Sequence, residues 1–221
     1  MNLLAIDCSC SVLSVAVKKG SNIYYEETDA NMKQSELVMD FIDSKIKEAF
    51  LQPKDLNGVL CMGGPGSFTG LRIGYSIAKG LALSLSIPFA VFPTLECISF
   101  NLLGFSLPVI KARKNAYFYA FFRDNQRIKE DSDNSTDHII QEISQYSQSE
   151  EIILTGPGAN ELFDSLPDNK NKNIILDNKK SGFAKELILI AEQKNIFNKT
   201  CDLNLYSGPE YIRKSDAELN F

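Results

Sequence analysis

The chain has 221 residues, of which 44% are hydrophobic, 23% charged and 10% aromatic. This composition excludes a wholly disordered chain and a collagen-like one, and the length allows a sizeable core without disulfide or metal staples. The 28 acidic and 23 basic residues give a formal net charge of −5, so the chain has no global electrostatic reason to bind nucleic acid by itself.

The sequence lacks the marks of a membrane or secreted protein. No apolar run approaches the roughly 20 residues that cross a bilayer, and Asp7 stands where a signal peptide would still be apolar. Five cysteines, an odd number, fit free buried thiols in a reducing compartment. We therefore expect a cytoplasmic protein that makes no membrane contact.

A single histidine limits the catalytic chemistry that this chain can perform. His138 is the one candidate base for a Ser-His-Asp triad, and a multi-histidine zinc or iron site cannot be built. It stands at a predicted helix start, where we interpret it as a solvated residue. We predict neither a catalytic residue nor a metal site.

The first half of the chain alternates strands and helices. From Val38 to Phe50 the apolar residues follow the i, i+3, i+4 spacing of an amphipathic helix, and Asn31 with Gln34 resembles a capping box. Pro53 and Pro88 mark the ends of two helices. The predicted strands are Leu3–Ile6, Val12–Val17, Ile23–Glu27 and Val59–Met62, and the predicted helices are Gln34–Phe50 and about Thr69–Ser86.

The second half repeats this order of elements, including a Gly-Pro-Gly turn before a helix. We infer a duplication of two α/β lobes, at residues 1–103 and 104–221, with a tail at 200–221 that the pattern does not place. The predicted strands are Leu107–Ile110, Ala116–Arg123, Gln126–Glu130 and Ile152–Thr155, and the predicted helices are Asp137–Tyr146, one through Leu162 and Phe163, and Phe183–Gln193.

The densest signal is the run Met62–Gly74, MGGPGSFTGLRIG. A glycine-rich turn between a strand and a helix N-terminus suits a phosphate, but neither the Walker spacing nor the dinucleotide spacing is present. A tight turn that binds nothing is the simpler interpretation. The residues expected to set this turn and cap the helix are Gly64, Gly66, Ser67, Thr69 and Gly70.

The helix after this turn is apolar most of the way round. Small residues recur every fourth position from Gly70 to Ala82, and a neighbouring apolar stripe runs from Ile73 to Leu85. Such a helix is buried on more than one side. One face is expected to pack on the sheet, and the other to meet either a partner subunit or the second lobe.

Two further patterns give weaker signals. Asp7, at the end of the first strand, could orient a metal-bound nucleotide, but the following turn has no glycine for close approach of phosphate oxygens, so we interpret Asp7 as a plain strand-end residue. Arg113, Lys114 and Arg123 flank an aromatic strand, which could hold single-stranded nucleic acid. In a chain of negative net charge, an ordinary buried strand is the better interpretation.

These motifs resemble the TsaB (YeaZ) family. The resemblance rests on Ala5-Ile6-Asp7, on GPGSFTGLRIG at 64–74 and on AKGLA at 78–82, and it covers the first half strongly and the second half loosely. Gly156-Pro157-Gly158 and Pro209-Glu210-Tyr211-Ile212-Arg213 stand where that family has a glycine turn and a terminal segment. Gln34 stands where the family often has His, and Lys111 where it commonly has Asp, which weakens any transfer of polar function.

The resemblance implies a two-lobed, duplicated actin-like fold of the ASKHA, ribonuclease H-like class. It also implies a non-catalytic scaffold in the synthesis of threonylcarbamoyladenosine next to the tRNA anticodon. The implied partners are TsaD, as a heterodimer, and the ATPase TsaE. ATP and a metal would sit on the partner and none on this chain alone, and tRNA would be contacted indirectly or weakly.

The family dimerises through helices of its first lobe, so we expect the partner interface there. A homodimer of the chain alone is an expected alternative state. The two rival functions are a stand-alone actin-like ATPase or small-molecule kinase that uses Asp7 and the glycine turn, and a homodimeric interaction protein. The residues expected at the interface are Met39, Phe41, Arg72, Gly74, Tyr75, Ser76, Ala78 and Lys79.

Overall fold

The computed structural model describes residues 1–30, 33–146, 150–167, 173–177, 182–198, 208–209 and 212. The chain forms two compact units, Met1–Cys97 with Gly182–Glu210, and Ile98–Ser181 with Tyr211–Phe221. The predicted division into 1–103 and 104–221 is therefore wrong, because the chain returns to the first unit at Gly182. Most of the predicted tail at 200–221 lies outside the described residues.

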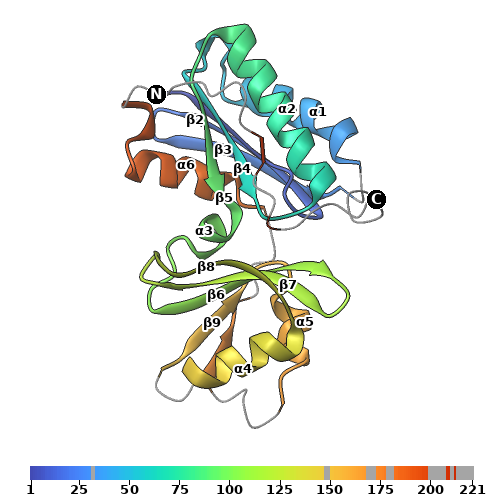
Figure 1. Ribbon diagram of the computed structural model, residues 1–221. Helices are drawn as coiled ribbons and strands as arrows, with labels where there is room; N and C mark the ends of the chain where they lie inside the picture. Colours follow the sequence, from blue (N-terminus) through green and yellow to red (C-terminus); the bar gives the residue numbers. More distant parts are fainter. Residues whose placement is uncertain are drawn as a thin grey trace. The chain divides into compact units, whose positions relative to one another are not determined.

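The first unit contains a five-stranded sheet in the order β3-β2-β1-β4-β5 (Figure 1). Strands β1 to β3 are antiparallel neighbours, whereas β4 runs parallel to β1 and β5 parallel to β4. Its elements are β1 (Leu3–Asp7), β2 (Val12–Lys19), β3 (Asn22–Asp29), α1 (Gln34–Glu48), η1 (Pro53–Asp55), β4 (Gly58–Gly64), α2 (Phe68–Leu85), β5 (Phe89–Pro93), α6 (Ala184–Gln193) and η3 (Ile196–Asn198), with α3 (Thr94–Ser99) leading into the second unit.

The second unit repeats this topology. Its sheet has the order β10-β9-β6-β7-β8, with β6 to β8 antiparallel and β9 and β10 parallel to β6, so each strand has a counterpart in the first sheet. This equivalence confirms the duplication. The elements are β6 (Phe105–Arg113), β7 (Ala116–Arg123), β8 (Gln126–Ser135), α4 (Thr136–Tyr146), β9 (Ile152–Thr155), α5 (Ala159–Asp164) and β10 (Ile174–Leu176).

Successive side chains of β1 point to opposite faces of the first sheet, and helices cover both faces. Leu4 and Ile6 join the core beneath α1 and α2, whereas α6 packs against β1 and β2 from the other face (Figure 1). Asp7 lies on the opposite face of β1 from Leu4 and Ile6, which is the face that α6 covers, and its side chain contacts the start of that helix. The sheet is thus buried on both sides, as parallel α/β sheets are.

The sequence patterns predict neither the 3₁₀ turns η1 and η3 nor three regular elements: β5, α3 and β10. These are short, and β5 and β10 are parallel edge strands without an apolar–polar alternation to reveal them. The predicted capping box of α1 is also wrong for Gln34, whose Nε2 donates to the Cys10 carbonyl (3.3 Å) while Lys33 is the N-cap residue. Asn31 lies outside the described residues.

Aromatic strand β7 is an ordinary buried strand, as predicted. Tyr117, Tyr119 and Phe121 lie in the core of the second unit, and the alternating Phe118 and Phe122 are buried as well. Four cysteines, at positions 8, 10, 61 and 97, are free and buried. Among the described helices, none is long and apolar enough to cross a membrane.

Candidate functional site

The glycines of the first turn let backbone meet backbone. A Cβ on Gly66 would overlap the Ser9 carbonyl oxygen, and one on Gly70 would overlap that of Cys8. The Ser67 N–H donates to the Ser9 carbonyl (2.7 Å), which ties the turn before α2 to the turn after β1. Gly66 and Gly70 therefore allow two backbone segments to pack against each other, and the backbone of Cys8 and Ser9 fills the space beside them.

Ser67 is the N-cap of α2. Its Oγ accepts a hydrogen bond from the Gly70 N–H at 3.2 Å, which satisfies one of the free donors at the helix start. Gly64, at φ +114°, takes the left-handed conformation that the entry to the turn requires. Thr69 is exposed in the first turn of the helix.

The small stripe of α2 faces its own sheet. Gly74 and Ala78 are buried, and a Cβ at Gly74 would lie 3.7 Å from the Cβ of Cys8. Tyr75 is also buried, edge-on to Phe89 at 5.5 Å between ring centroids. Assigning Gly74, Tyr75 and Ala78 to a partner interface is therefore wrong: small side chains let α2 approach the sheet closely. A Gly74→Leu variant would test folding, not partner contact.

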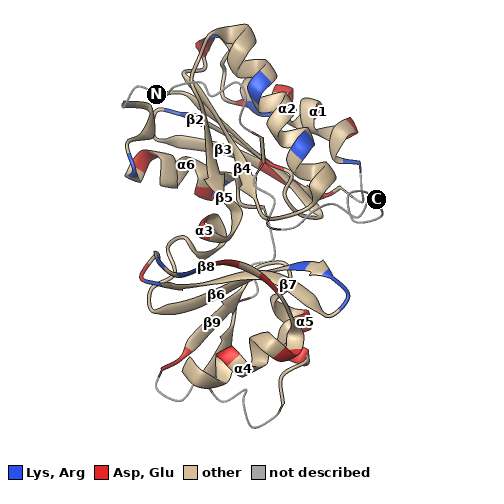
Figure 2. Ribbon diagram, viewed as in Figure 1, with Lys and Arg blue, Asp and Glu red and all other residues tan. Residues whose placement is uncertain are grey.

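The neighbouring apolar stripe faces outward instead. Ile73 and Ile77 are only partly buried, and with Ser35, Thr69, Arg72 and Ser76 they line a groove of about 440 Å³ between α1 and α2. Arg72 and Lys79 are the charged residues of α2, which Figure 2 shows as otherwise uncharged. The groove has an apolar floor and a polar rim, and the predicted interface residues on it are Arg72 and Ser76.

The remaining predicted interface residues lie on the same two helices. Met39, on α1, is exposed (48%), whereas Phe41 is partly buried against the core of the first unit. The Lys79 ammonium lies 5.5 Å from the centroid of the Tyr75 ring, and the Arg72 guanidinium lies 5.6 Å from that of Phe68. These cation–π contacts hold both basic side chains along the helix surface.

Asp7 is more than a plain strand-end residue. It is fully buried, its Oδ1 accepts from the Ser9 N–H (2.9 Å) and hydroxyl (2.7 Å), and its Oδ2 accepts from the Phe183 N–H (3.1 Å). Burial raises the pKa of this carboxyl above its ordinary value, against the lowering effect of these hydrogen bonds. Sequence reasoning missed this role because Phe183 is 176 positions away.

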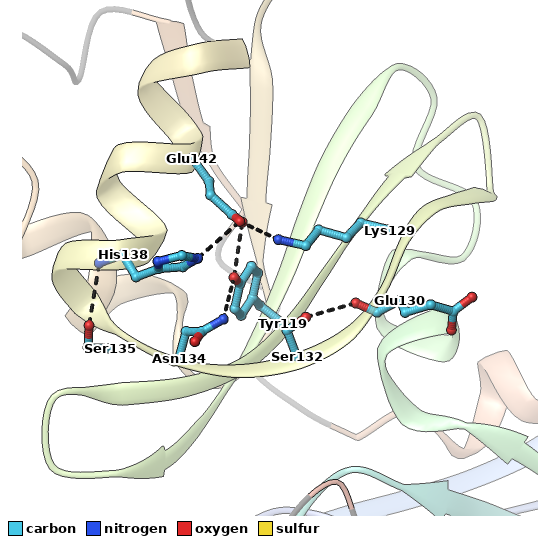
Figure 3. Close-up of polar contacts among 8 residues, drawn as sticks. All are labelled: Tyr119, Lys129, Glu130, Ser132, Asn134, Ser135, His138 and Glu142. Atoms are coloured by element: carbon cyan, nitrogen blue, oxygen red, sulfur yellow. Dashed lines mark hydrogen bonds and ion pairs between the residues drawn. The ribbon is translucent and has the colours of Figure 1, made fainter.

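A separate polar cluster lies in the second unit, around Glu142 of α4 (Figure 3). Its carboxylate accepts from the Tyr119 hydroxyl (3.0 Å) and pairs with Lys129, and the His138 Nε2 lies 3.2 Å away. The Tyr119 hydroxyl in turn accepts from Asn134 (3.0 Å). Burial alone would raise the pKa of Glu142, but the bonds from Lys129 and Tyr119 outweigh it and hold the pKa below its ordinary value.

This cluster lacks the geometry of a nucleophilic triad. His138 stands in the first turn of α4, half exposed, as the sequence predicts. The Ser135 hydroxyl contacts the backbone N–H of His138 and not its ring, and the Ser132 hydroxyl donates to a carbonyl of its own strand (Figure 3). Tyr119 of β7 and Lys129 of β8 instead tie α4 to the sheet through the Glu142 carboxylate.

Comparisons with known proteins agree with this geometry. A family model described as TsaD, tRNA N6-adenosine threonylcarbamoyltransferase, matches residues 26–203. The tRNA threonylcarbamoyladenosine biosynthesis protein TsaB of Bacillus subtilis is 32% identical over 127 residues, 56% of each chain. TsaB of Escherichia coli is 30% identical over 95 residues, 43% of this chain and 41% of that protein. The chain thus spans about half the length of the curated relatives it matches.

Two solved structures from Pseudomonas aeruginosa share the fold. An uncharacterized protein with similarity to peptidase YEAZ gives a TM-score of 0.82 at 16% identity, over 96% of this chain and 99% of that one. YeaZ gives a TM-score of 0.67 at 16% identity, over 88% and 93%. With the repeated sheet topology, these matches confirm the duplicated actin-like α/β fold. Because the family model covers residues 26–203 and TsaB proteins are among its curated relatives, the chain belongs to the TsaD family and, within it, to the TsaB (YeaZ) group.

Proposed function

We propose that this chain is a non-catalytic scaffold in the complex that transfers threonylcarbamoyl to the adenosine following the tRNA anticodon. A TsaD homologue is its heterodimer partner, and a TsaE-type ATPase engages that pair. The partner, and not this chain alone, carries ATP and a metal. tRNA contacts this chain indirectly or weakly. Participation in threonylcarbamoyladenosine synthesis is supported by the relatives in Bacillus subtilis and Escherichia coli, which are biosynthesis proteins of that modification.

The observation that best supports the non-catalytic assignment is that groups of the chain itself already bind the Asp7 carboxylate. Both oxygens of this carboxylate accept hydrogen bonds from protein groups, and the Gly66–Gly70 turn is packed on the carbonyls of Cys8 and Ser9. Holding a metal-bound phosphate with Asp7 would require breaking the bond to Phe183. This weighs against the stand-alone ATPase or kinase that the sequence left open.

The surface that supports a partner is the groove between α1 and α2. An apolar floor of Ile73 and Ile77 with a polar rim is the anatomy of a protein interface core. The partner would approach along Arg72 and Ser76, with Met39 on the neighbouring helix as an exposed apolar contact. Such a face also allows a homodimer when the chain is alone.

Light scattering after size exclusion tests this proposal, with the chain alone and mixed with the TsaD homologue from the same genome. We expect a one-to-one complex that replaces any self-dimer. Ser76→Arg should lower the affinity at least about tenfold, since a bulky charge would stand over the apolar floor. Ser21→Arg, at an exposed site in the β2–β3 turn, is the matched control and should bind normally.

Two outcomes would overturn the proposal. Unmixed peaks at concentrations well above those of the cell would remove the scaffold role, and ATP binding by the isolated chain in calorimetry would then favour the ATPase. A stable dimer of the chain that the TsaD homologue fails to replace would favour the homodimeric interaction protein. Full binding by Ser76→Arg would leave the complex standing but place its interface elsewhere.

A further inference from the structure

The chain re-enters the first unit at one well-defined place. It leaves that unit after Cys97 and returns at Gly182, directly before α6. Phe183, the N-cap residue of α6, makes no side-chain capping bond of its own. The first N–H groups of the helix therefore need acceptors from elsewhere.

Three strands of the first sheet supply partners to three consecutive residues. Asp7, at the end of β1, accepts from the Phe183 N–H (3.1 Å), and Ser14, on β2, accepts from the Ala184 N–H (3.1 Å). Tyr25, on β3, donates its hydroxyl to the Gly182 carbonyl (2.6 Å). Asp7 and Ser14 are fully buried.

The third partner is held in place as well. The single proton of the Tyr25 hydroxyl is shared between the Gly182 carbonyl and the Glu27 carboxylate, and the Lys185 ammonium lies 4.3 Å from the centroid of the Tyr25 ring. Burial and the Glu27 carboxylate raise the pKa of Tyr25, so the phenol keeps its proton and remains a donor at neutral pH. Gly182, at φ +90°, has no room for a Cβ, which would overlap Glu27.

We propose that Asp7, Ser14 and Tyr25 form a return clamp, which fixes the point where the chain re-enters the first unit and thereby limits motion of the second unit relative to the first. The inference goes beyond the scaffold role and stands without it. It explains why a strand-end carboxylate, a buried serine and a partly buried tyrosine from three strands all converge on one short stretch of backbone.

The clamp can be opened with conservative variants. Ser14→Ala and Tyr25→Phe each remove one hydroxyl, and their combination removes two of the three attachments. Hydrogen exchange read at single residues should show the Ala184 amide exchanging about fivefold faster in Ser14→Ala, which removes its acceptor, while the Phe183 amide keeps its bond to Asp7. Tyr119→Phe, which removes a hydroxyl from the second unit, is the matched control and should leave both amides unchanged.

The decisive measurement is the motion between the units. Spin labels carried by a keto amino acid at exposed Ser84 and Gln141, one in each unit, leave the native thiols untouched. We expect the double variant to broaden the distribution of label-to-label distances, and Tyr119→Phe to leave it as in the parent chain. An unchanged distribution in a double variant whose Ala184 amide exchanges faster would overturn the proposal and reduce these residues to a local helix cap.

Asp7→Asn extends the test to the third attachment. It removes the charge while keeping the size of the side chain, so its distance distribution should broaden in the same way. If this variant fails to fold, Ser14→Ala and Tyr25→Phe still decide the question. Partner affinity for the TsaD homologue, measured on the same variants, separates this proposal from the scaffold role, because the groove between α1 and α2 lies apart from the clamp residues.

Discussion

The two Gly-Pro-Gly turns occupy equivalent places in the two units, after β4 and after β9, yet they lead to different helices. Both are packed on main chain: Ser67 N–H donates to the Ser9 carbonyl (2.7 Å), and Gly158 N–H donates to the Val109 carbonyl (3.0 Å). The first turn starts the 18-residue helix α2 with a serine cap, whereas the second starts the 6-residue α5 without a side-chain cap. The two turns thus pack in the same way, but only the turn of the first unit leads into a long helix with a partly exposed apolar face.

That difference indicates what each unit is built for. α2 buries its small residues against the sheet and leaves Ile73 and Ile77 partly exposed in a groove. The second unit instead ties α4 to its sheet through a partly buried carboxylate, Glu142. The first unit therefore exposes a partly apolar groove, which is the surface of the proposed partner interface, whereas Glu142 ties α4 of the second unit to its own sheet.

Among substitutions that test this difference between the units, the largest loss of stability is expected at Gly70. Gly70→Ala should destabilise the first unit by about 3 kcal/mol or more, because its Cβ would overlap the backbone oxygen of Cys8. Gly156→Ala, in the Gly-Pro-Gly turn of the second unit, should cost about 2 kcal/mol, since its φ is +96° and its Cβ would lie 2.7 Å from the Val109 carbonyl oxygen. Urea unfolding monitored for each unit gives both values. A larger loss at Gly156 would reverse the ranking of the two turns.

A smaller effect is expected at Glu142. Glu142→Gln should destabilise the second unit by about 1–2 kcal/mol at neutral pH, because it removes charge-assisted bonds to Lys129 and Tyr119. The folded-state pKa of Glu142 is depressed, so its contribution is present above the unfolded value of about 4.5 and is lost as pH falls through the folded pKa. Thermal unfolding from pH 7 to pH 3 should show the two proteins converging. Glu130→Gln, at an exposed site on β8, is the control, and parallel curves for Glu142→Gln would contradict the assignment.

The smallest effect has the opposite sign. Gly80, on the outer side of α2, is exposed and has nothing within 4 Å of a Cβ, so Gly80→Ala should stabilise the chain by about 0.5–1 kcal/mol. Chemical unfolding gives the value. The same variant in the light-scattering assay would sharpen the interface, since weaker binding to the TsaD homologue would extend the contact along α2 to this position.

Local patterns predicted much of the fold. The i, i+3, i+4 spacing predicts α1 and α2, because it repeats with the turn of a helix. The matched order of elements in the two halves predicts the duplication. Two edge strands and α3 carry no such period, and they were missed. The division of the chain was also wrong, because nothing in the Phe183–Gln193 pattern says which sheet that helix covers.

The candidate site divides in the same way. Local residue patterns are enough to predict the glycine turn, the serine cap, the apolar character of α2 and, through GPGSFTGLRIG, the family. Which face of α2 lies inside depends on packing against the sheet, because the small stripe and the isoleucine stripe are both apolar and hydrophobicity alone cannot rank them. Only the tertiary structure decides the partners of Asp7, since a hydrogen bond across 176 positions depends on the fold bringing β1 to the start of α6.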